Sequence, residues 1–177
     1  PGVMRYVHTE GDNYRIRYVF NANDGEHIYG LGQEQEDAFD RKGTSTELVH
    51  YNTKSVIPFY YSSLGYGFLW NNPAPGRCET TFNHTMWVAD SAYQADFIVF
   101  VGDTPKDVMK TYADLTGYSP MMPKWAAGFW QCKCRYESQD ILLNVAREYK
   151  RRGIPIDAIV IDFFHWTEQG DLKFDPK

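Results

Sequence analysis

The apolar residues in the first hundred positions recur with the two-residue period of a β-strand, and no helical period interrupts them. In the segment 14–20, large apolar side chains at the even positions alternate with Arg15, Arg17 and Val19, as in a half-buried strand. Further strands are expected at 56–61, 66–70, 80–88 and 95–101, and the first two of these form a hairpin around residues 62–65. Many short strands without helices pack as two sheets, so we predict a β-sandwich.

A helix at 104–116 is predicted to close this first domain, which spans residues 1–117. Thr104 can cap the helix, Pro105 suits its first turn and Gly117 can end it. One apolar face is expected to carry Val108, Met109, Tyr112 and Leu115. The segment 118–124 contains two prolines, and we expect it to be a linker between domains.

The remaining residues, 125–177, follow the pattern of a β-α-β unit. A strand at 128–134 precedes a helix that Ser138 caps and Gly153 ends, and the run 156–161 is almost continuously apolar. Continuous apolarity is typical of a parallel strand that is buried on both faces. Because the sequence offers this strand no further partner, we expect a truncated domain, most simply the start of a (β/α)₈ TIM barrel.

Charge and cysteine content narrow the possible partners. The net charge is -5, which argues against a nucleic-acid partner, and no apolar run approaches the roughly 20 residues that a membrane-spanning helix needs. Cys132 and Cys134 lack the companion ligands of a zinc site, and three cysteines form no disulfide framework. We therefore expect no membrane and no metal. The cellular compartment stays open.

Aromatic residues make up 16% of the chain, which has two explanations. They could form a large aromatic core, or they could provide flat platforms for sugar rings. Composition alone favours the core, because aromatic side chains bury large areas in any fold.

Candidate functional residues follow the two strands of the β-α-β unit, since TIM barrels carry their sites at the carboxyl ends of strands. Cys134, Arg135 and Tyr136 follow the first strand. Asp162 directly follows the second, and four large rings come next, at positions 163–166. A carboxylate among rings can bind sugar hydroxyls and stack on sugar faces, although Asp162 could instead cap a loop and the rings could belong to a core.

Several segments, in order, resemble glycoside hydrolase family 31. Residues 29–34, Tyr-Gly-Leu-Gly-Gln-Glu, are similar to a motif of that family's galactose-mutarotase-like β-domain, and residues 57–60 and 65–72 are similar to its next segments. Residues 123–131 resemble its first barrel strand, and 159–176 resemble the second strand with its loop. The Gln-Cys-Lys-x-Arg-Tyr and Asp-Phe-Phe-His-Trp segments most resemble those of α-xylosidases.

This resemblance implies a retaining mechanism with two aspartates, which such enzymes hold about 5–5.5 Å apart. In the family both follow later barrel strands, beyond Lys177, so this chain is expected to carry no catalytic residue and to be inactive alone. Glu34, Glu36 and Asp157 are not candidates. Asp171 and Asp175 are expected to be loop carboxylates.

Substrate binding is what the resemblance assigns to this chain. Asp162 is expected to accept a hydrogen bond from a hydroxyl of the bound sugar. Phe163 and Phe164 would narrow the pocket where glucose places its hydroxymethyl group, which favours xylose. The other expected wall residues are Trp166, Arg135, Trp130 and, on a loop of the β-domain, Asn52. Leu172 stands where the resemblance leads us to expect an aromatic ring of the rim, which could lie on the leaving-group side.

Three functions remain open. An α-xylosidase fragment is the first, an α-glucosidase of the same family is the second, and a non-catalytic carbohydrate-binding β-sandwich is the third. The expected partner is an α-xylosyl or α-glucosyl oligosaccharide, and the implied chemistry needs no cofactor. The full-length protein could form a homo-oligomer, on which the sequence is silent.

Overall fold

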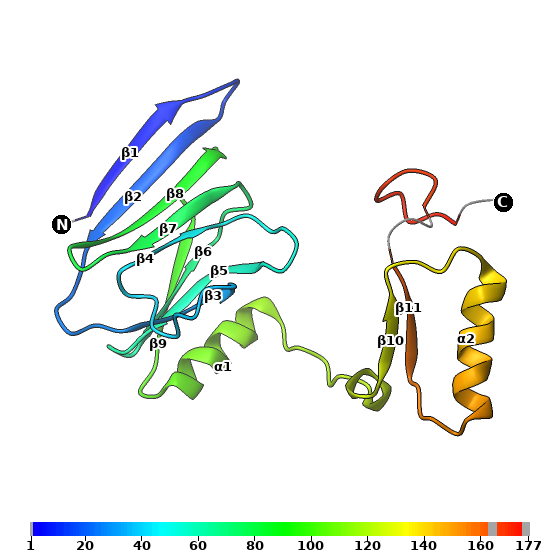
Figure 1. The fold of residues 1–177 in the computed structure, drawn as a ribbon. Helices are drawn as coiled ribbons and strands as arrows, with labels where there is room; N and C mark the ends of the chain where they lie inside the picture. The colour runs from blue at the N-terminus through cyan, green and yellow to red at the C-terminus, as the bar shows by residue number, and fades with distance from the viewer. Residues whose placement is uncertain (1, 163–165, 175–177) are drawn as a thin grey trace. The chain divides into compact units, whose positions relative to one another are not determined.

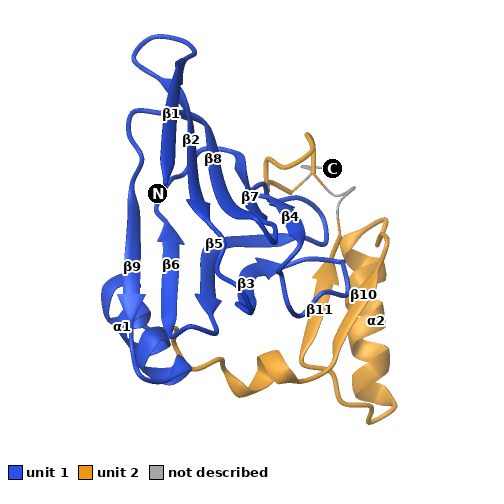
Figure 2. Ribbon diagram, turned by 90° about the vertical axis from the view of Figure 1, so that its left-hand side faces the viewer, with its two compact units in different colours: residues 1–118 blue, residues 119–177 orange. Residues whose placement is uncertain are grey.

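The computed structural model describes residues 2–162 and 166–174. The chain divides into two compact units, Pro1–Tyr118 and Ser119–Lys177, which Figure 2 shows in different colours. Each unit is described by itself below.

The first unit is a sandwich of two antiparallel sheets (Figure 1). One sheet has the order β1-β2-β8-β7-β4 and the other β3-β5-β6-β9. The bounds in the first sheet are Val3–His8 (β1), Tyr14–Asn21 (β2), His84–Ala92 (β8), Gly76–Thr80 (β7) and Thr44–Glu47 (β4). Those in the second are Ile28–Gln33 (β3), Ser55–Ser62 (β5), Tyr66–Trp70 (β6) and Phe97–Val101 (β9).

The predicted sandwich and the β5–β6 hairpin are confirmed, but the strand expected at 80–88 is only partly right, because residues 84–88 lie in β8 while 81–83 do not. That segment contains the tight turn between β7 and β8, which pair antiparallel. The hydroxyl of Thr81 accepts a hydrogen bond from the backbone N–H of His84 over 3.0 Å and donates one to the His84 carbonyl over 3.0 Å. This side-chain bonding turns the chain without a glycine or proline.

Stacked aromatic rings fill the space between the two sheets. Phe68 and Trp70 from β6, Tyr60 from β5 and Trp87 from β8 are all buried. The ring of Trp87 lies 5.4 Å from that of Phe68, with 18° between their planes, and 6.0 Å from that of Trp70, also at 18°. The high aromatic content of this unit is thus largely accounted for by its core.

The helix α1, Pro105–Thr116, covers the outer face of the second sheet. Val108 is fully buried against Phe59, Leu69 and Phe100. Gly67 makes this close approach possible, because an added Cβ there would lie 2.7 Å from the Phe59 ring and 2.8 Å from a Val108 methyl. The expected four-residue apolar face is wrong in part: Tyr112 packs here, but Met109 and Leu115 are 46% and 57% exposed.

Both predicted ends of this helix are confirmed. The Thr104 hydroxyl accepts from the backbone N–H of Asp107, whose carboxylate accepts from the backbone N–H of Thr104 over 3.0 Å, which completes a capping box. At the other end, the N–H of Gly117 donates to the Ala113 carbonyl over 2.8 Å, with φ at 99°.

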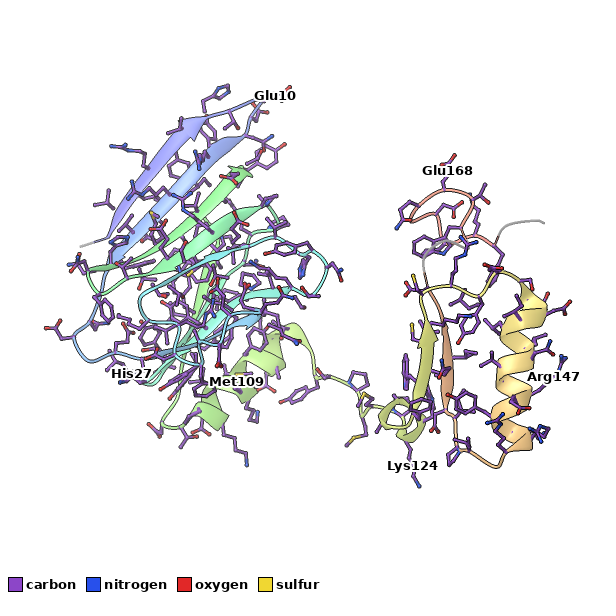
Figure 3. The ribbon with its side chains drawn as sticks, in the orientation of Figure 1. Glu10, His27, Met109, Lys124, Arg147 and Glu168 are labelled. Carbon is purple, nitrogen blue, oxygen red and sulfur yellow. The ribbon has the colours of Figure 1, made fainter. Side chains whose placement is uncertain are left out.

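The second unit begins with a 3₁₀ turn, Lys124–Ala127, and continues as the predicted β-α-β pattern (Figures 1 and 3). The strand β10 spans Trp130–Lys133, the helix α2 spans Gln139–Arg151, and β11 spans Ala158–Ile161. The Ser138 hydroxyl accepts from the N–H of Ile141, and Gly153 follows α2 at a φ of 66°, so both predicted ends are confirmed. Across the described ranges, no helix is long and apolar enough to cross a membrane.

A buried carboxylate lies near one end of the sandwich. Glu26, only 3% exposed, accepts hydrogen bonds from the hydroxyls of Ser62 and Tyr66, each over 2.6 Å, and from the Lys42 ammonium over 3.2 Å. Burial alone would raise the pKa of Glu26, but these three hydrogen bonds and the Lys42 charge outweigh it and lower that pKa below its ordinary value of 4.5. Burial and the bond to Glu26 raise the pKa of Tyr66 to about 12, so the phenol remains a donor.

Replacing Glu26 by glutamine should destabilise the sandwich by about 2–4 kcal/mol at neutral pH, since it removes the charge that three buried donors surround. A lowered carboxyl pKa contributes stability above its unfolded value of 4.5 and loses it as the pH falls through the folded value. The difference between wild type and Glu26→Gln in chemical unfolding should therefore shrink below about pH 4.5. The matched control is Glu47→Gln on the exposed face of β4, which should stay within about 0.5 kcal/mol; an equal effect of both changes would contradict this account.

Candidate functional site

The register of the two parallel strands brings the predicted site residues to one end of the second unit. Lys133 lies opposite Ile161, so the residues that follow β10 and β11 leave the sheet at the same end, the carboxyl end of both strands. Parallel pairing requires a crossover connection, and α2 provides it. Cys134 and Asp162 are therefore the first residues beyond the two carboxyl ends.

The carboxylate of Asp162 lies beside the thiol of Cys132. The Cys132 Sγ is 3.8 Å from the Asp162 Oδ2, and Asp162 is partly exposed. A thiol is a weak hydrogen-bond donor, so this contact contributes to orienting the carboxylate at the strand end. Sequence reasoning selected Asp162 but not Cys132, although the two-residue period of β10 could have suggested which of its side chains lie near the strand end.

Trp166 belongs to a loop that closes on itself after β11. A bridge joins Trp166 to Phe174, and the Asp171 carboxylate accepts from the backbone N–H of Lys173 over 3.0 Å. Glu168, labelled in Figure 3, lies in this loop. Leu172, at a φ of 53°, is 77% exposed, so an aliphatic side chain points to solvent at the position where an aromatic ring is expected.

Two of the predicted site residues, Phe163 and Phe164, lie outside the described residues, as do His165 and Asp175. The predicted narrowing of the sugar pocket by the two phenylalanines stays a prediction.

Arg135 follows β10 by two residues and pairs with a surface carboxylate. Its guanidinium lies 3.5 Å from the Glu137 Oε1, and both side chains are more than half exposed. Exposed pairs of this kind contribute little to stability, about 0–1 kcal/mol. The neighbouring Tyr136 is 7% exposed and receives a hydrogen bond from Gln131, so of the three residues after this strand, Tyr136 belongs to the packing.

Trp130 lies at the other end of the strand pair. It begins β10 opposite Ala158, and its ring stacks on that of Trp125 at 5.6 Å. Asp157 lies at this end as well, where its carboxylate accepts from the backbone N–H of Phe129 over 3.2 Å. The structure thus places Asp162 and Cys134 at the carboxyl end of the two strands and Trp130 at their amino end.

Asn52 lies in the first unit, at an exposed turn whose base is a buried ion pair. Tyr51 and Lys54 form a bridge, Thr53 between them has a φ of 72°, and the Lys54 ammonium is 2.9 Å from the Glu34 Oε1. Both charged side chains are largely buried. Sequence reasoning missed this pair, which fixes the turn that presents Asn52.

The residues before Glu34 explain the Tyr-Gly-Leu-Gly-Gln-Glu motif. Gly30, Leu31 and Gly32 all have positive φ values, and the pairing of β3 with β5 shifts register between the two glycines. An added Cβ at Gly32 would lie 2.2 Å from the Ser55 carbonyl oxygen, so no other residue fits. This bulge bends β3 and directs Glu34 towards Lys54.

A cavity of about 400 Å³ in the second unit is not at the predicted site. Its lining includes Phe129, Tyr149, Ile154 and Pro155, which lie at the beginning of the strands and the end of α2. Sites in TIM barrels lie at the carboxyl ends of strands, and the opposite end serves stability. Among the described side chains, no group of three or more His, Cys, Asp or Glu is placed to hold a metal ion.

Comparison with known proteins decides the family. Residues 4–79 match the glycosyl hydrolase 31 N-terminal galactose mutarotase-like domain, and residues 119–177 match the glycosyl hydrolases family 31 TIM-barrel domain. The chain belongs to glycoside hydrolase family 31. The predicted fold class, a galactose-mutarotase-like sandwich followed by the start of the barrel domain, is confirmed.

Two curated relatives match 94% of this chain. An uncharacterized family 31 glucosidase, ORF2, of Pseudescherichia vulneris is 45% identical over 166 residues, and an α-xylosidase of Saccharolobus solfataricus is 40% identical over 177 residues. The chain spans 31% and 24% of the lengths of these two proteins.

Two solved structures share the fold. The crystal structure of a family 31 α-xylosidase from a soil metagenome, complexed with xylose, is 48% identical and has a TM-score of 0.87 over 97% of this chain and 25% of its own. A xylosidase from Aspergillus niger is 33% identical, with a TM-score of 0.85 over 98% of this chain and 24% of its own.

Proposed function

We propose that this chain is part of a retaining α-glycosidase that releases α-linked xylose, and that it supplies one wall of the sugar pocket. The observation that carries this proposal is the position of Asp162, at the carboxyl end of β11 and 3.8 Å from the Cys132 thiol. Support for xylose comes from relatives named α-xylosidases, which are 40% and 48% identical to this chain.

The proposed reaction needs two further carboxyl groups. One attacks the anomeric carbon to form a glycosyl-enzyme intermediate, and the other protonates the leaving oxygen and then activates water. We assign both to later strands of the barrel domain. Asp157 precedes the first residue of β11, and its carboxylate accepts a hydrogen bond from the backbone N–H of Phe129. This position argues against Asp157 as the nucleophile or the acid/base.

Asp162 would bind the sugar rather than attack it. Its carboxylate can accept hydrogen bonds from ring hydroxyls, and bonds to a charged acceptor are worth about 1.5–3 kcal/mol each. Trp166 and Arg135 would contribute to the rim at the same end of the strands. The assignment of Asn52 to the pocket stays a prediction from the sequence. Trp130 begins β10, at the opposite end of the strands from Asp162, and its place in the pocket stays a prediction.

Selection of the sugar would fall to Phe163 and Phe164. Xylose lacks the hydroxymethyl group of glucose, so bulky side chains at that point of the pocket would exclude glucose by steric clash. If instead the complete enzyme cleaves an aryl α-glucoside faster than the aryl α-xyloside, the protein is an α-glucosidase of the same family.

Replacing Asp162 by asparagine in the complete enzyme should lower kcat/KM for an aryl α-xyloside about 10- to 150-fold, because a charged acceptor of a sugar hydroxyl is lost. The measurement is steady-state hydrolysis at neutral pH, with the thermal unfolding of both proteins compared. The control is Glu168→Gln in the exposed loop after β11, which should leave kcat/KM within about twofold. An unchanged kcat/KM in Asp162→Asn would remove Asp162 from the pocket.

Replacing Phe164 by alanine, or Phe163 in a second variant, should raise the ratio of kcat/KM for aryl α-glucoside to that for aryl α-xyloside. A pocket that excludes one extra carbon group discriminates between two substrates about 10- to 200-fold in kcat/KM. The glucoside-to-xyloside ratio should therefore rise at least tenfold in the variant of the more important residue. Met121→Ala, in the exposed segment at the start of the second unit, is the control. If both phenylalanine variants keep the wild-type ratio, the steric account is wrong.

The purified 177-residue chain should not hydrolyse an aryl α-xyloside or α-glucoside, because the proposed catalytic pair lies outside it. The assay is release of the aryl group at high protein concentration, with the complete enzyme as the positive control. Turnover by the chain alone, at a rate that Asp162→Asn lowers, would overturn the assignment of the catalytic pair to later strands.

A further inference from the structure

A second hollow, of about 240 Å³, lies in the first unit near the turn between β7 and β8. Its lining combines apolar surface with the side chains of several charged and polar residues and one exposed ring: Asp24, Glu26, His27, Asp40, Lys42 and Phe82. None of these residues has a part in the proposed glycosidase site. His27 is labelled in Figure 3, at the edge of the sandwich.

Hydrogen bonds hold three of the polar side chains of this hollow, those of His27, Asp40 and Glu26, before any ligand arrives. The His27 Nδ1 lies 2.6 Å from the Asp40 Oδ2, and the Asp40 Oδ1 accepts from the backbone N–H groups of Ile28 and Lys42, over 3.1 and 3.0 Å. Glu26 is held by Ser62, Tyr66 and the Lys42 ammonium, as described above. Acceptors that are already oriented bind a ligand without the entropic cost of ordering side chains.

The Asp40 carboxyl is ionised at neutral pH. Burial alone would raise its pKa, but the hydrogen bonds from His27 and from two backbone N–H groups outweigh burial and lower the pKa below the ordinary 3.8. Asp40 is therefore an acceptor in this hollow.

The ring of Phe82 forms an apolar wall next to these acceptors. It belongs to the turn between β7 and β8, is 75% exposed, and lies against the backbone of Gly43, where an added Cβ would be 3.2 Å from the ring. A large apolar ring in solvent does not stabilise the fold through burial. One aromatic face beside a few fixed polar groups is the composition of a small-molecule site.

Charge and size restrict the ligand. Asp24, Glu26 and Asp40 outnumber the single ammonium of Lys42, so an anionic ligand would be repelled. The volume of about 240 Å³ is below the roughly 300–1,000 Å³ of pockets for drug-sized ligands. A single neutral ring with several hydroxyls and an apolar C–H face fits both restrictions.

We propose that this hollow is a second carbohydrate-binding site, which takes one neutral pyranose ring stacked on Phe82 with its hydroxyls bound by Asp24, His27 and Asp40. Such a site would hold a glycan on the sandwich through one of its rings. The inference does not depend on the proposed α-xylosidase activity.

The test is residue-resolved NMR of the ¹⁵N-labelled 177-residue chain, titrated with methyl α-xyloside and, separately, methyl α-glucoside. Ligands of this size bind single-ring sites with dissociation constants on the order of a few millimolar. The backbone amides of Gly25, Lys42 and Gly43 should shift with a saturable dependence on glycoside concentration. Phe82→Ala should weaken that binding about 2- to 12-fold, the range expected for one ring contact.

A matched control is Tyr93→Ala, which removes another exposed ring from the turn that follows β8 and should leave the titration unchanged. Asp162→Asn should also leave these amide shifts unchanged, so failure of the glycosidase site and failure of this site can be told apart. No saturable shift at the three amides, or the same affinity in Phe82→Ala, would overturn the proposal. Shifts produced by glucuronate or by Ca²⁺ but not by the neutral glycosides would overturn it as well.

Discussion

The stacking of aromatic rings between the two sheets is the interaction on which the first unit depends. Phe68 in β6 lies within 5.7 Å of Tyr60, Trp87 and Phe97, and each of these three rings is within 18° of parallel to it. Each ring buries about 150–250 Å². The stack also carries a cost, because the indole N–H groups of Trp70 and Trp87 find no acceptor among the described residues. Each unsatisfied N–H costs about 1–3 kcal/mol of folding free energy. The buried area of the whole stack outweighs that cost.

Local rules predicted the elements whose signals are local. Strand alternation over 14–20 and the caps at Thr104, Gly117 and Ser138 all correspond to observed features. The turn at 81–83 could not be predicted in the same way, because Thr81, Phe82 and Asn83 contain no glycine or proline and read as a strand. The exposure of Met109 was not predicted either. The helical period indicates which side of a helix faces the sheet, but not how many residues of that side the sheet covers.

Prediction of the candidate site was limited in the same way: features with a local signal could be predicted, and contacts that depend on the fold could not. The position of Asp162 follows from one strand end and a general property of barrels, and the parallel register places it as expected. Its neighbour Cys132 and the Glu34–Lys54 pair depend on contacts between residues 30 and 20 positions apart, for which a single sequence gives no local signal. The hollow beside Phe82 combines the segments 23–27, 40–42 and 82, and its existence could be known only from the fold.

The packing of α1 on the second sheet has a consequence for how this sandwich can change over evolutionary time. Position 67 has no room for a side chain, because Phe59 and Val108 occupy the space that a Cβ would need. A larger residue at position 67 can be accommodated only together with a smaller residue at 59 or 108. Substitutions at these three positions are therefore expected to be coupled. Met109 and Leu115, on the exposed part of the same helix, carry no such obligation and can diverge one at a time.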